Sequence, residues 1–354
     1  MPSAEKILTA IRALNLPPVK LMEVCGTHTM AIARAGIKSV LPETVELLSG
    51  PGCPVCVTPA EVIDSVLELA MEPGVILASY GDMLRVPGSV PGDSLLRRRA
   101  LGARVEIVYS PMDAIEIARE NPGKEVVFLG VGFETTAPGT AAAVLSAREE
   151  KLKNFSVWSL LKLVEPALRA LLAREDFSVQ GFLCPGHVAT ILGEKGFAFL
   201  PEEYGMPAVI SGFEPEDILL SVYGLLRQIA EGKPRLQNEY TRAVSPGGNE
   251  LAQRILREAF VLRPDLWRGL GRIEASGLGL RPELADYDAQ RRFGREQLPA
   301  SRPTACRCGE VITGRRAPAD CPLFGTRCTP EDPVGPCMVS SEGACAAAYK
   351  YRLV

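Results

Sequence analysis

Short apolar runs alternate with helix-forming segments through residues 20–215, and this alternation limits the folds open to the chain. A continuous apolar run is typical of a parallel strand that is covered on both faces. The runs expected as strands are Lys20–Val24, Val75–Ser79, Val105–Tyr109, Val126–Val131, Val179–Leu183 and Ala208–Ser211. We therefore predict an α/β fold of two lobes with mainly parallel sheets flanked by helices, plus a cysteine-rich C-terminal domain.

Three segments are expected to form helices, two because of their N-terminal capping patterns and one because of its length. Thr58-Pro-Ala-Glu61 has the pattern of a capping box with proline at the first helical position, and it predicts a helix to about Met71. Ser110-Pro-Met-Asp113 repeats this pattern before a helix that is expected to end near Asn121. Residues 214–232 are expected to form a long helix.

Changes in composition divide the chain into three expected domains. The first lobe is predicted over residues 20–150, the second over 151–235, and a helical, cysteine-rich domain over 236–354. An amphipathic helix within residues 1–19 is a candidate to join the last domain. Residues 79–93 are rich in glycine and proline, which predicts a long functional loop.

Charge and hydropathy argue against several classes of protein. The 354 residues carry a net charge of −3, whereas a nucleic-acid binder normally has a basic excess. No apolar run reaches the roughly 18 residues of a membrane span, and the N-terminal residues lack the pattern of a signal peptide. We therefore expect a cytoplasmic protein whose thiols stay reduced.

Six of the ten cysteines lie in the last 49 residues, a density that indicates metal or redox chemistry. They are Cys306, Cys308, Cys321, Cys328, Cys337 and Cys345. The spacing of the last four fits neither a zinc ribbon nor a compact ferredoxin run. Four irregularly spaced thiolates suit an iron–sulfur cluster, while zinc, disulfides or free thiols remain alternatives. Cys306 and Cys308 would then be a redox pair, spare ligands or packed side chains.

A second group of thiols lies in the expected first lobe. Cys53-Pro-Val-Cys56 directly precedes a predicted helix, and a helix N-terminus stabilises a thiolate. This environment is typical of a thiol–disulfide exchange pair. Half of a zinc site is the alternative interpretation.

Two Cys-x-x-His turns each follow a predicted strand. These are Cys25-Gly-Thr-His28 and Cys184-Pro-Gly-His187. A thiolate and an imidazole at this spacing can bind a metal or act as nucleophile and base, although a cysteine after a buried strand usually packs in the core. The similarity is either chance or a duplication in which each lobe presents one turn at the carboxyl edge of its sheet.

Two further polar turns follow predicted strands. Glu134, Thr135 and Thr136 lie in Gly132-Phe-Glu-Thr-Thr-Ala-Pro138, where they would contact a substrate or cap a helix. Ser211-Gly-Phe-Glu-Pro215 is a similar turn. Gly130-x-Gly132 lacks the third glycine of a dinucleotide fingerprint, so nucleotide binding is not expected there.

Together these motifs resemble the HypD family of hydrogenase maturation factors, from residue 22 to residue 345. The resemblance rests on Cys25-Gly-Thr-His-Thr-Met30, Gly50-Pro-Gly-Cys-Pro-Val-Cys-Val-Thr-Pro59, Gly132-Phe-Glu-Thr-Thr-Ala-Pro138, Pro185-Gly-His-Val188, Asp320-Cys-Pro-Leu-Phe-Gly325 and Gly335-Pro-Cys-Met-Val-Ser-Ser-Glu-Gly-Ala-Cys345. It implies a scaffold on which the Fe(CN)2CO unit of [NiFe]-hydrogenases is assembled with a small HypC-type chaperone. Cyanide would come from a HypE-type donor, as a thiocyanate made with the help of HypF, and the unit would pass towards the hydrogenase large subunit.

The same resemblance implies roles for individual residues. Cys25 would bind the iron of the assembled centre, with His28 polarising a ligand or moving protons. Cys53 and Cys56 would form a redox pair that receives electrons from a [4Fe-4S] cluster, as in ferredoxin:thioredoxin reductase. Cluster ligands would be Cys321, Cys328, Cys337 and Cys345, and ligand contacts would come from Thr27, Glu134, Thr135 and His187. No role follows for Cys184.

Two other functions compete with this hypothesis. One is a free-standing iron–sulfur thiol–disulfide reductase, which needs Cys53, Cys56 and the tail but gives Cys25 and His28 no special task. The other is an interaction module stabilised by zinc. Measuring iron, sulfide and zinc in the purified protein distinguishes the zinc module from the assembly scaffold and from the iron–sulfur reductase.

Overall fold

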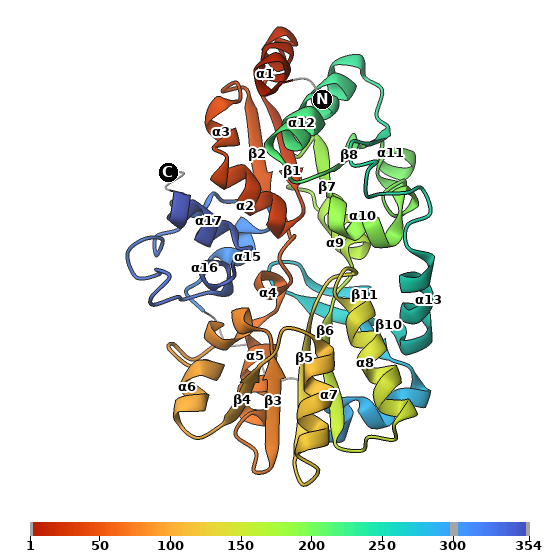
Figure 1. The fold of residues 1–354 in the computed structure, drawn as a ribbon. Coiled ribbons are helices and arrows are strands. Elements are labelled where there is room, and N and C mark those ends of the chain that lie inside the picture. Colours follow the sequence, from red (N-terminus) through yellow and green to blue (C-terminus); the bar gives the residue numbers. More distant parts are fainter. Residues whose placement is uncertain (1–2, 298–303, 352–354) are drawn as a thin grey trace.

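Two parallel sheets form two lobes, and the cysteine-rich tail packs beside them (Figure 1). The computed structural model describes residues 3–297 and 304–351. Sheet A forms lobe A, the upper lobe of Figure 1, and has the strand order β2-β1-β7-β8-β9. Sheet B forms lobe B, the lower lobe, and has the order β4-β3-β5-β6. The predicted α/β architecture is confirmed.

The strand bounds agree closely with the predicted runs. Sheet A contains β1 (Val19–Glu23), β2 (Val45–Ser49), β7 (Gly181–Pro185), β8 (Ala208–Ser211) and β9 (Leu236–Asn238). Sheet B contains β3 (Val75–Ser79), β4 (Arg104–Ile107), β5 (Glu125–Gly132) and β6 (Phe155–Leu161). An antiparallel hairpin consists of β10 (Phe260–Trp267) and β11 (Gly271–Leu280). All six predicted strands are present, whereas β2, β6, β9 and the hairpin are not predicted by the sequence pattern.

Helices cover both faces of each sheet. Those around sheet A are α1 (Ala4–Ala13), α2 (Gly26–Arg34), α3 (Ile37–Val40) and α12 (Pro215–Glu231) on one face, with α10 (Gly186–Leu192) and α11 (Phe199–Tyr204) on the other. Those around sheet B are α7 (Pro111–Glu120) and α8 (Ala137–Glu149) on one face, with α5 (Ala60–Leu69) on the other, while α9 (Val164–Leu172) packs against β11 and α11. The remaining helices are α4 (Pro54–Val57), α6 (Leu95–Ala100), α13 (Glu250–Ala259), α14 (Ala289–Arg292), α15 (Cys308–Val311), α16 (Pro336–Val339) and α17 (Ala344–Tyr351). Within the described residues, none of the helices has the length and apolar character that crossing a bilayer requires.

Successive residues of the sheet A strands point into different cores. Leu21 and Leu183 pack in the core beneath α1 and α12. Met22 and Phe182, one residue away on the same strands, lie in the larger core that continues into lobe B. All four side chains are fully buried. The middle of each central strand is therefore apolar on both faces, because neither face of the sheet meets water there.

Neither lobe is a continuous stretch of sequence. β1 and β2 pair with β7–β9 in sheet A, while the intervening β3–β6 form sheet B. The boundary expected near residue 150 therefore falls inside lobe B, where β6 pairs with β5. Parallel strands are joined by long crossovers, so nearness in the sequence does not reveal which strands share a sheet. The N-terminal helix α1 packs against α12 of lobe A rather than against the tail.

The two predicted helix caps have different outcomes. Ser110 caps α7, accepting from the Met112 amide at 3.2 Å while the Asp113 carboxylate accepts from the Ser110 amide at 2.9 Å. Thr58 does not cap α5. It ends the short helix α4, and its hydroxyl donates to the Pro54 carbonyl at 2.9 Å. The chain thus forms a separate four-residue helix after Cys53, and α5 begins only after Pro59.

Candidate functional site

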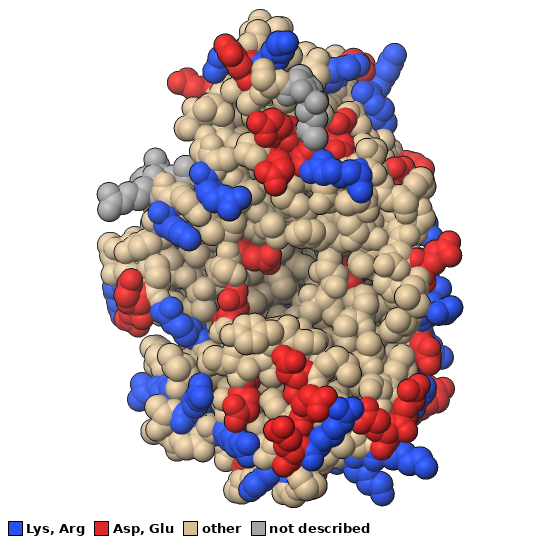
Figure 2. All heavy atoms as spheres, viewed as in Figure 1, with Lys and Arg blue, Asp and Glu red and all other residues tan. Residues whose placement is uncertain are grey.

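The site lies at the carboxyl ends of three neighbouring strands of sheet A, where open α/β sheets bind ligands. β1 leads into the Cys25–His28 turn, β7 into the Cys184–His187 turn, and β8 into the turn that contains Phe213. The two Cys-x-x-His turns therefore share one sheet, because β1 and β7 are paired. The expectation that each lobe presents one such turn is wrong. Figure 2 shows a hollow between the two lobes, with mostly uncharged residues around it.

Phe213 brings the two histidines together. The ring centroid of Phe213 lies 4.6 Å from that of His28 and 3.9 Å from that of His187, and both pairs are stacked. Tyr240 packs edge-on against the same phenylalanine ring. The turn that contains Phe213 stands out in the sequence, but no role for the phenylalanine itself follows from it. Its position in a glycine-containing turn after a strand, like those of the histidines, is the signal that could have identified it.

His28 presents a neutral imidazole with one free nitrogen. Its Nε2 lies 2.8 Å from the carbonyl oxygen of Gly212, so we assign the proton to Nε2, which donates to that oxygen. No described residue is hydrogen-bonded to the buried Nδ1. Burial lowers the pKa of His28 to about 4, and partial burial also lowers the pKa of His187. The Nδ1 lone pair is therefore available as an acceptor at neutral pH.

Cys25 is a buried thiol held by its own turn. Its amide donates to Glu23 Oε2 at 3.0 Å, and the Thr29 hydroxyl donates to Glu23 Oε1. Burial raises the pKa of Glu23 to about 7 and that of Cys25 to about 12. Cys25 is thus a protonated thiol at neutral pH, and binding a metal would release its proton.

Cys53 and Cys56 form a disulfide on the segment that crosses from lobe A to lobe B. The Cys56 amide donates to Cys53 Sγ at 3.1 Å, as expected at the start of the short helix α4. The carbonyl of the neighbouring Gly52 accepts from the Gly26 amide at 2.9 Å. A Cβ atom on Gly52 would lie 2.2 Å from the Cys25 nitrogen, so only glycine permits this close approach. The disulfide segment therefore runs directly against the Cys25 turn.

All six tail cysteines line a single small cavity. Its other lining side chains include Leu323, Phe324 and Met338. The members are the four predicted ligands Cys321, Cys328, Cys337 and Cys345, together with Cys306 and Cys308. Cys308 and Cys337 have lowered pKa values because each accepts a hydrogen bond from a second thiol, Cys306 and Cys345 respectively. Backbone amides also point at sulfur: those of Val334 and Cys345 donate to Cys328 and Cys337.

The donor set of this cavity suits a cluster better than a single ion. Within residues 3–297 and 304–351, no group of three or more His, Cys, Asp or Glu side chains is arranged to hold one metal ion. An iron–sulfur cube needs a different arrangement, since each iron takes its own thiolate and the thiols must surround a space. Six soft sulfur donors line this one cavity, and sulfur is the donor type that such a cluster takes.

The loop between the last two tail cysteines touches both front thiol sites. The Ser340 hydroxyl lies 3.4 Å from Cys53 Sγ, and the Thr27 hydroxyl donates to Glu342 Oε1 at 2.9 Å. Asp82, in the loop predicted to be functional, accepts from the amide and hydroxyl of Ser341. In Figure 1, α2 and α4 accordingly lie next to α16 and α17. The fold therefore brings the front and back cysteine groups together.

Three residues singled out in the sequence take no part in these contacts. Glu134 Oε1 accepts from the Val164 amide at the start of α9, at 2.9 Å, and burial raises the Glu134 pKa to about 7. Thr135 is exposed in the same turn. Cys184 is fully buried behind the turn that carries His187, and burial raises its pKa. Cys184 thus behaves as a packed core side chain.

The sequence has close relatives among characterised proteins. The family described as HypD, hydrogenase formation hypA family, matches residues 3–352. The hydrogenase maturation factor HypD2 of Bradyrhizobium diazoefficiens is 48% identical over 97% of this chain and 92% of its own length. HypD of Escherichia coli is 45% identical over 95% of this chain and 90% of its own length. The chain therefore belongs to the HypD family of hydrogenase maturation factors.

Proposed function

We propose that this chain is the cytoplasmic scaffold on which the Fe(CN)2CO unit of [NiFe]-hydrogenases is assembled. The observation that carries the proposal is the convergence of three thiol sites. The Cys25 turn, the Cys53–Cys56 disulfide and the loop between Cys337 and Cys345 are in direct contact. A scaffold that binds iron at one thiol and exchanges electrons at other thiols needs these sites to lie close together.

The iron cargo would bind through Cys25 Sγ. The buried thiol gives up its proton as the Fe–S bond forms, and a soft thiolate suits the low-spin iron that cyanide and carbon monoxide favour. His28 offers its free Nδ1 as an acceptor, and Phe213 holds His187 beside it. A HypC-type chaperone would supply a further ligand, a HypE-type donor with HypF upstream would supply cyanide, and the large subunit would receive the unit.

The tail would hold a [4Fe-4S] cluster through Cys321, Cys328, Cys337 and Cys345. Such a cluster supplies single electrons when bound. Cys306 and Cys308 line the same cavity and are the competing ligands. Six single Cys→Ser variants, purified without oxygen, distinguish the sets: the four ligand variants lose iron and sulfide, and the other two keep about four of each per chain.

Cys25→Ala tests the scaffold role. The variant should keep the iron and sulfide of the tail but lose the iron–cyanide and iron–carbonyl infrared bands of the complex with the HypC-type partner. Cys184→Ala is the matched control, because it removes a buried thiol from the neighbouring strand and should keep the bands. Bands of full intensity in Cys25→Ala would show that Cys25 is not the ligand.

A thiol–disulfide reductase is the second candidate, and the disulfide next to Ser340 favours it. This function predicts turnover of a protein disulfide by the isolated chain, with Cys25→Ala as active as the wild type. The scaffold predicts no such turnover without its partners. Zinc in place of iron in the purified protein would argue against both functions.

A further inference from the structure

The tip of the β10–β11 hairpin lies between the two redox-competent thiol sites. The Arg268 amide donates to the Val57 carbonyl at 2.8 Å. Its guanidinium donates twice to the Thr58 carbonyl, from Nε at 3.1 Å and from a terminal nitrogen at 2.8 Å. Val57 and Thr58 end the helix α4, which carries Cys56. Arg268 therefore supplies three of the donors that the carbonyls at this helix end require.

The same tip packs against the tail at the cysteine cavity. A Cβ atom on Gly269 would lie 2.4 Å from the carbonyl oxygen of Gly309, the residue after Cys308. Gly269 also has a φ of +79°, so glycine is required there both by the lack of space and by the backbone conformation. The Arg268 side chain lies at the same contact, because a Cβ atom on Gly309 would be 3.7 Å from Arg268 Cγ. Arg268 thus carries its positive charge next to the residue that follows Cys308, a lining residue of the cavity, and holds α4 by its hydrogen bonds.

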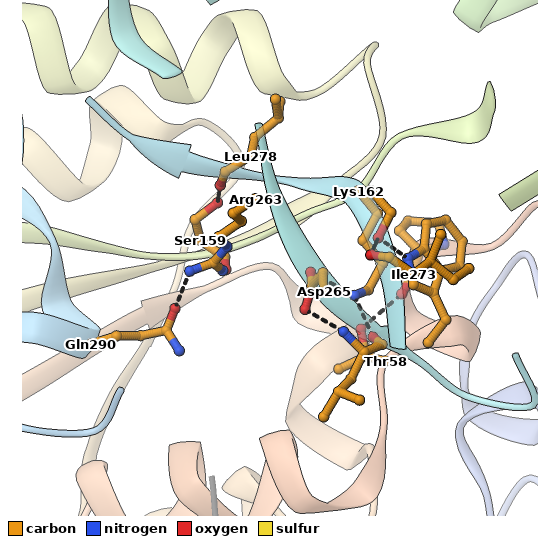
Figure 3. A network of polar contacts seen from close by, with 12 residues as sticks. Thr58, Ser159, Lys162, Arg263, Asp265, Ile273, Leu278 and Gln290 are labelled. Carbon is orange, nitrogen blue, oxygen red and sulfur yellow. Dashed lines mark hydrogen bonds and ion pairs between the residues drawn. The ribbon is translucent and has the colours of Figure 1, made fainter. Parts of the chain in front are cut away.

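Strand β10, which leads to the tip, is fixed to lobe B, as Figure 3 shows. Lys162, at the end of β6, donates to Asp265 Oδ2 at 2.8 Å and to the Leu266 carbonyl at 2.7 Å. Arg263 donates to the Ser159 carbonyl at 2.6 Å and to Gln290 at 2.8 Å. Because these contacts hold the strand that leads to the tip, the guanidinium of Arg268 is held in one place. A mobile surface arginine would not be held in this way.

We propose that Arg268 is a positioning residue that couples the Cys53–Cys56 helix to the tail cysteine cavity. It fixes the end of α4 and stabilises negative charge at the Cys306–Cys308 side of the cavity. The electrostatic part rests on the proposed function, since it requires a redox-active cluster in the cavity. Reduction adds one electron there, and a nearby cation stabilises the reduced state.

The test uses three variants of the full-length protein, purified without oxygen. Arg268→Met removes the charge and the two side-chain donors, while Arg268→Lys keeps the charge but loses the two-pronged contact with Thr58. Arg272→Met is the matched control, because Arg272 lies on the same hairpin with its side chain exposed and, among the described residues, paired only with Glu274 at 3.5 Å. The readouts are the midpoint potential of the cluster and amide hydrogen exchange in residues 53–58 and 306–312.

Arg268→Met should shift the midpoint potential to a more negative value, and Arg268→Lys should restore it. A tenfold change in the equilibrium constant corresponds to about 59 mV for one electron. Both Arg268 variants should exchange amides in residues 53–58 about tenfold faster, because a hydrogen bond from a charged group is lost. The Met variant should also exchange faster in residues 306–312, and Arg272→Met should change neither quantity.

Failure of this proposal is distinguishable from failure of the proposed function. A wild-type protein without iron would overturn the cluster and the electrostatic part together, while faster exchange in both segments of Arg268→Met would still support the coupling. With iron present, a midpoint potential in Arg268→Met equal to that of Arg272→Met overturns the electrostatic part. Exchange in residues 53–58 that matches the control overturns the positional part.

Discussion

Thr27 donates a hydrogen bond to Glu342 across 2.9 Å, and this contact joins the Cys25 turn to the C-terminal tail. Glu342 lies in the loop between Cys337 and Cys345. Its side chain also fills the space beside Gly26, where a Cβ atom would lie 2.3 Å from that of Glu342. The position of the tail on lobe A is therefore determined by close contacts at two successive residues of one turn.

Thr27→Val should loosen this junction. Valine has nearly the shape of threonine but cannot donate, so the largely buried carboxylate of Glu342 loses its partner. We expect a loss of about 1–3 kcal/mol in the free energy of unfolding, measured by urea denaturation. Thr9→Val is the control, because Thr9 is exposed on α1 and its hydroxyl only donates to Glu5 within the same helix. Equal effects of the two substitutions would contradict the assigned role of Thr27.

Gly52→Ala should disturb the contact between the Cys53–Cys56 segment and the Cys25 turn. The new methyl group would meet backbone atoms of Val24 and Cys25 within 2.5 Å, and a backbone cannot move aside as a side chain can. We expect a loss of about 1–3 kcal/mol in the free energy of unfolding. Gly123→Ala adds the same group where no atom lies within 4 Å. A loss as large in the Gly123 variant would contradict the argument.

Glu134 should make the protein less stable as the pH rises. Burial raises its pKa from 4.5 to about 7, so the folded state binds the proton more tightly than the unfolded state does. The resulting stabilisation is complete below pH 4.5 and is lost as the pH passes 7, with an upper limit of about 3 kcal/mol. Glu134→Gln keeps an acceptor for the Val164 amide but cannot titrate.

The check on Glu134 is the free energy of unfolding of both proteins at several pH values between about 4.5 and 7.5. The wild type should lose more stability over this range than Glu134→Gln does. The variant should still show a residual slope, because burial also raises the pKa of Glu23 to about 7. Parallel curves would show that Glu134 does not titrate in this range.

Lys162→Met should be strongly destabilising. The Lys162 side chain is 1% exposed and that of its partner Asp265 is 13% exposed, so the substitution leaves an unpaired carboxylate in a poorly solvated place. We expect a loss of about 3–5 kcal/mol. The double variant Lys162→Met with Asp265→Asn should recover part of this loss, because it removes the charge. Failure to recover any of it would assign the loss to packing rather than to the ion pair.

An exposed pair on the same hairpin provides the comparison for Lys162. Arg272 and Glu274 have side chains that are 63% and 80% exposed. Arg272→Met should change the free energy of unfolding by less than about 1 kcal/mol, because water screens such a pair. Urea denaturation of both variants measures the difference between the buried and the exposed ion pair.

Local features were predictable from short stretches of sequence. The strand at Val75–Ser79 was predicted to the residue, because a run of five apolar or small side chains specifies a strand buried on both faces. The Ser110 cap was predicted because the cap and its partner Asp113 lie within one helical turn. The predicted Thr58 cap is wrong, since the Thr58 hydroxyl donates back to the Pro54 carbonyl at the end of α4, a short helix that the sequence pattern does not predict.

The site was predictable as a set of residues but not as an arrangement. Sequence alone selected Cys25, His28, Cys53, Cys56 and the tail cysteines, because their types and spacing imply thiol and metal chemistry whatever the fold. Only the folded chain places the Cys25 turn beside His187 and Phe213, since that depends on pairing such as Leu21 with Gly181 across 160 residues. The hairpin tip of Arg268 and the Glu342 loop reach the site in the same way. Contacts of this kind are set by how sheets and loops pack, and no local pattern encodes that packing.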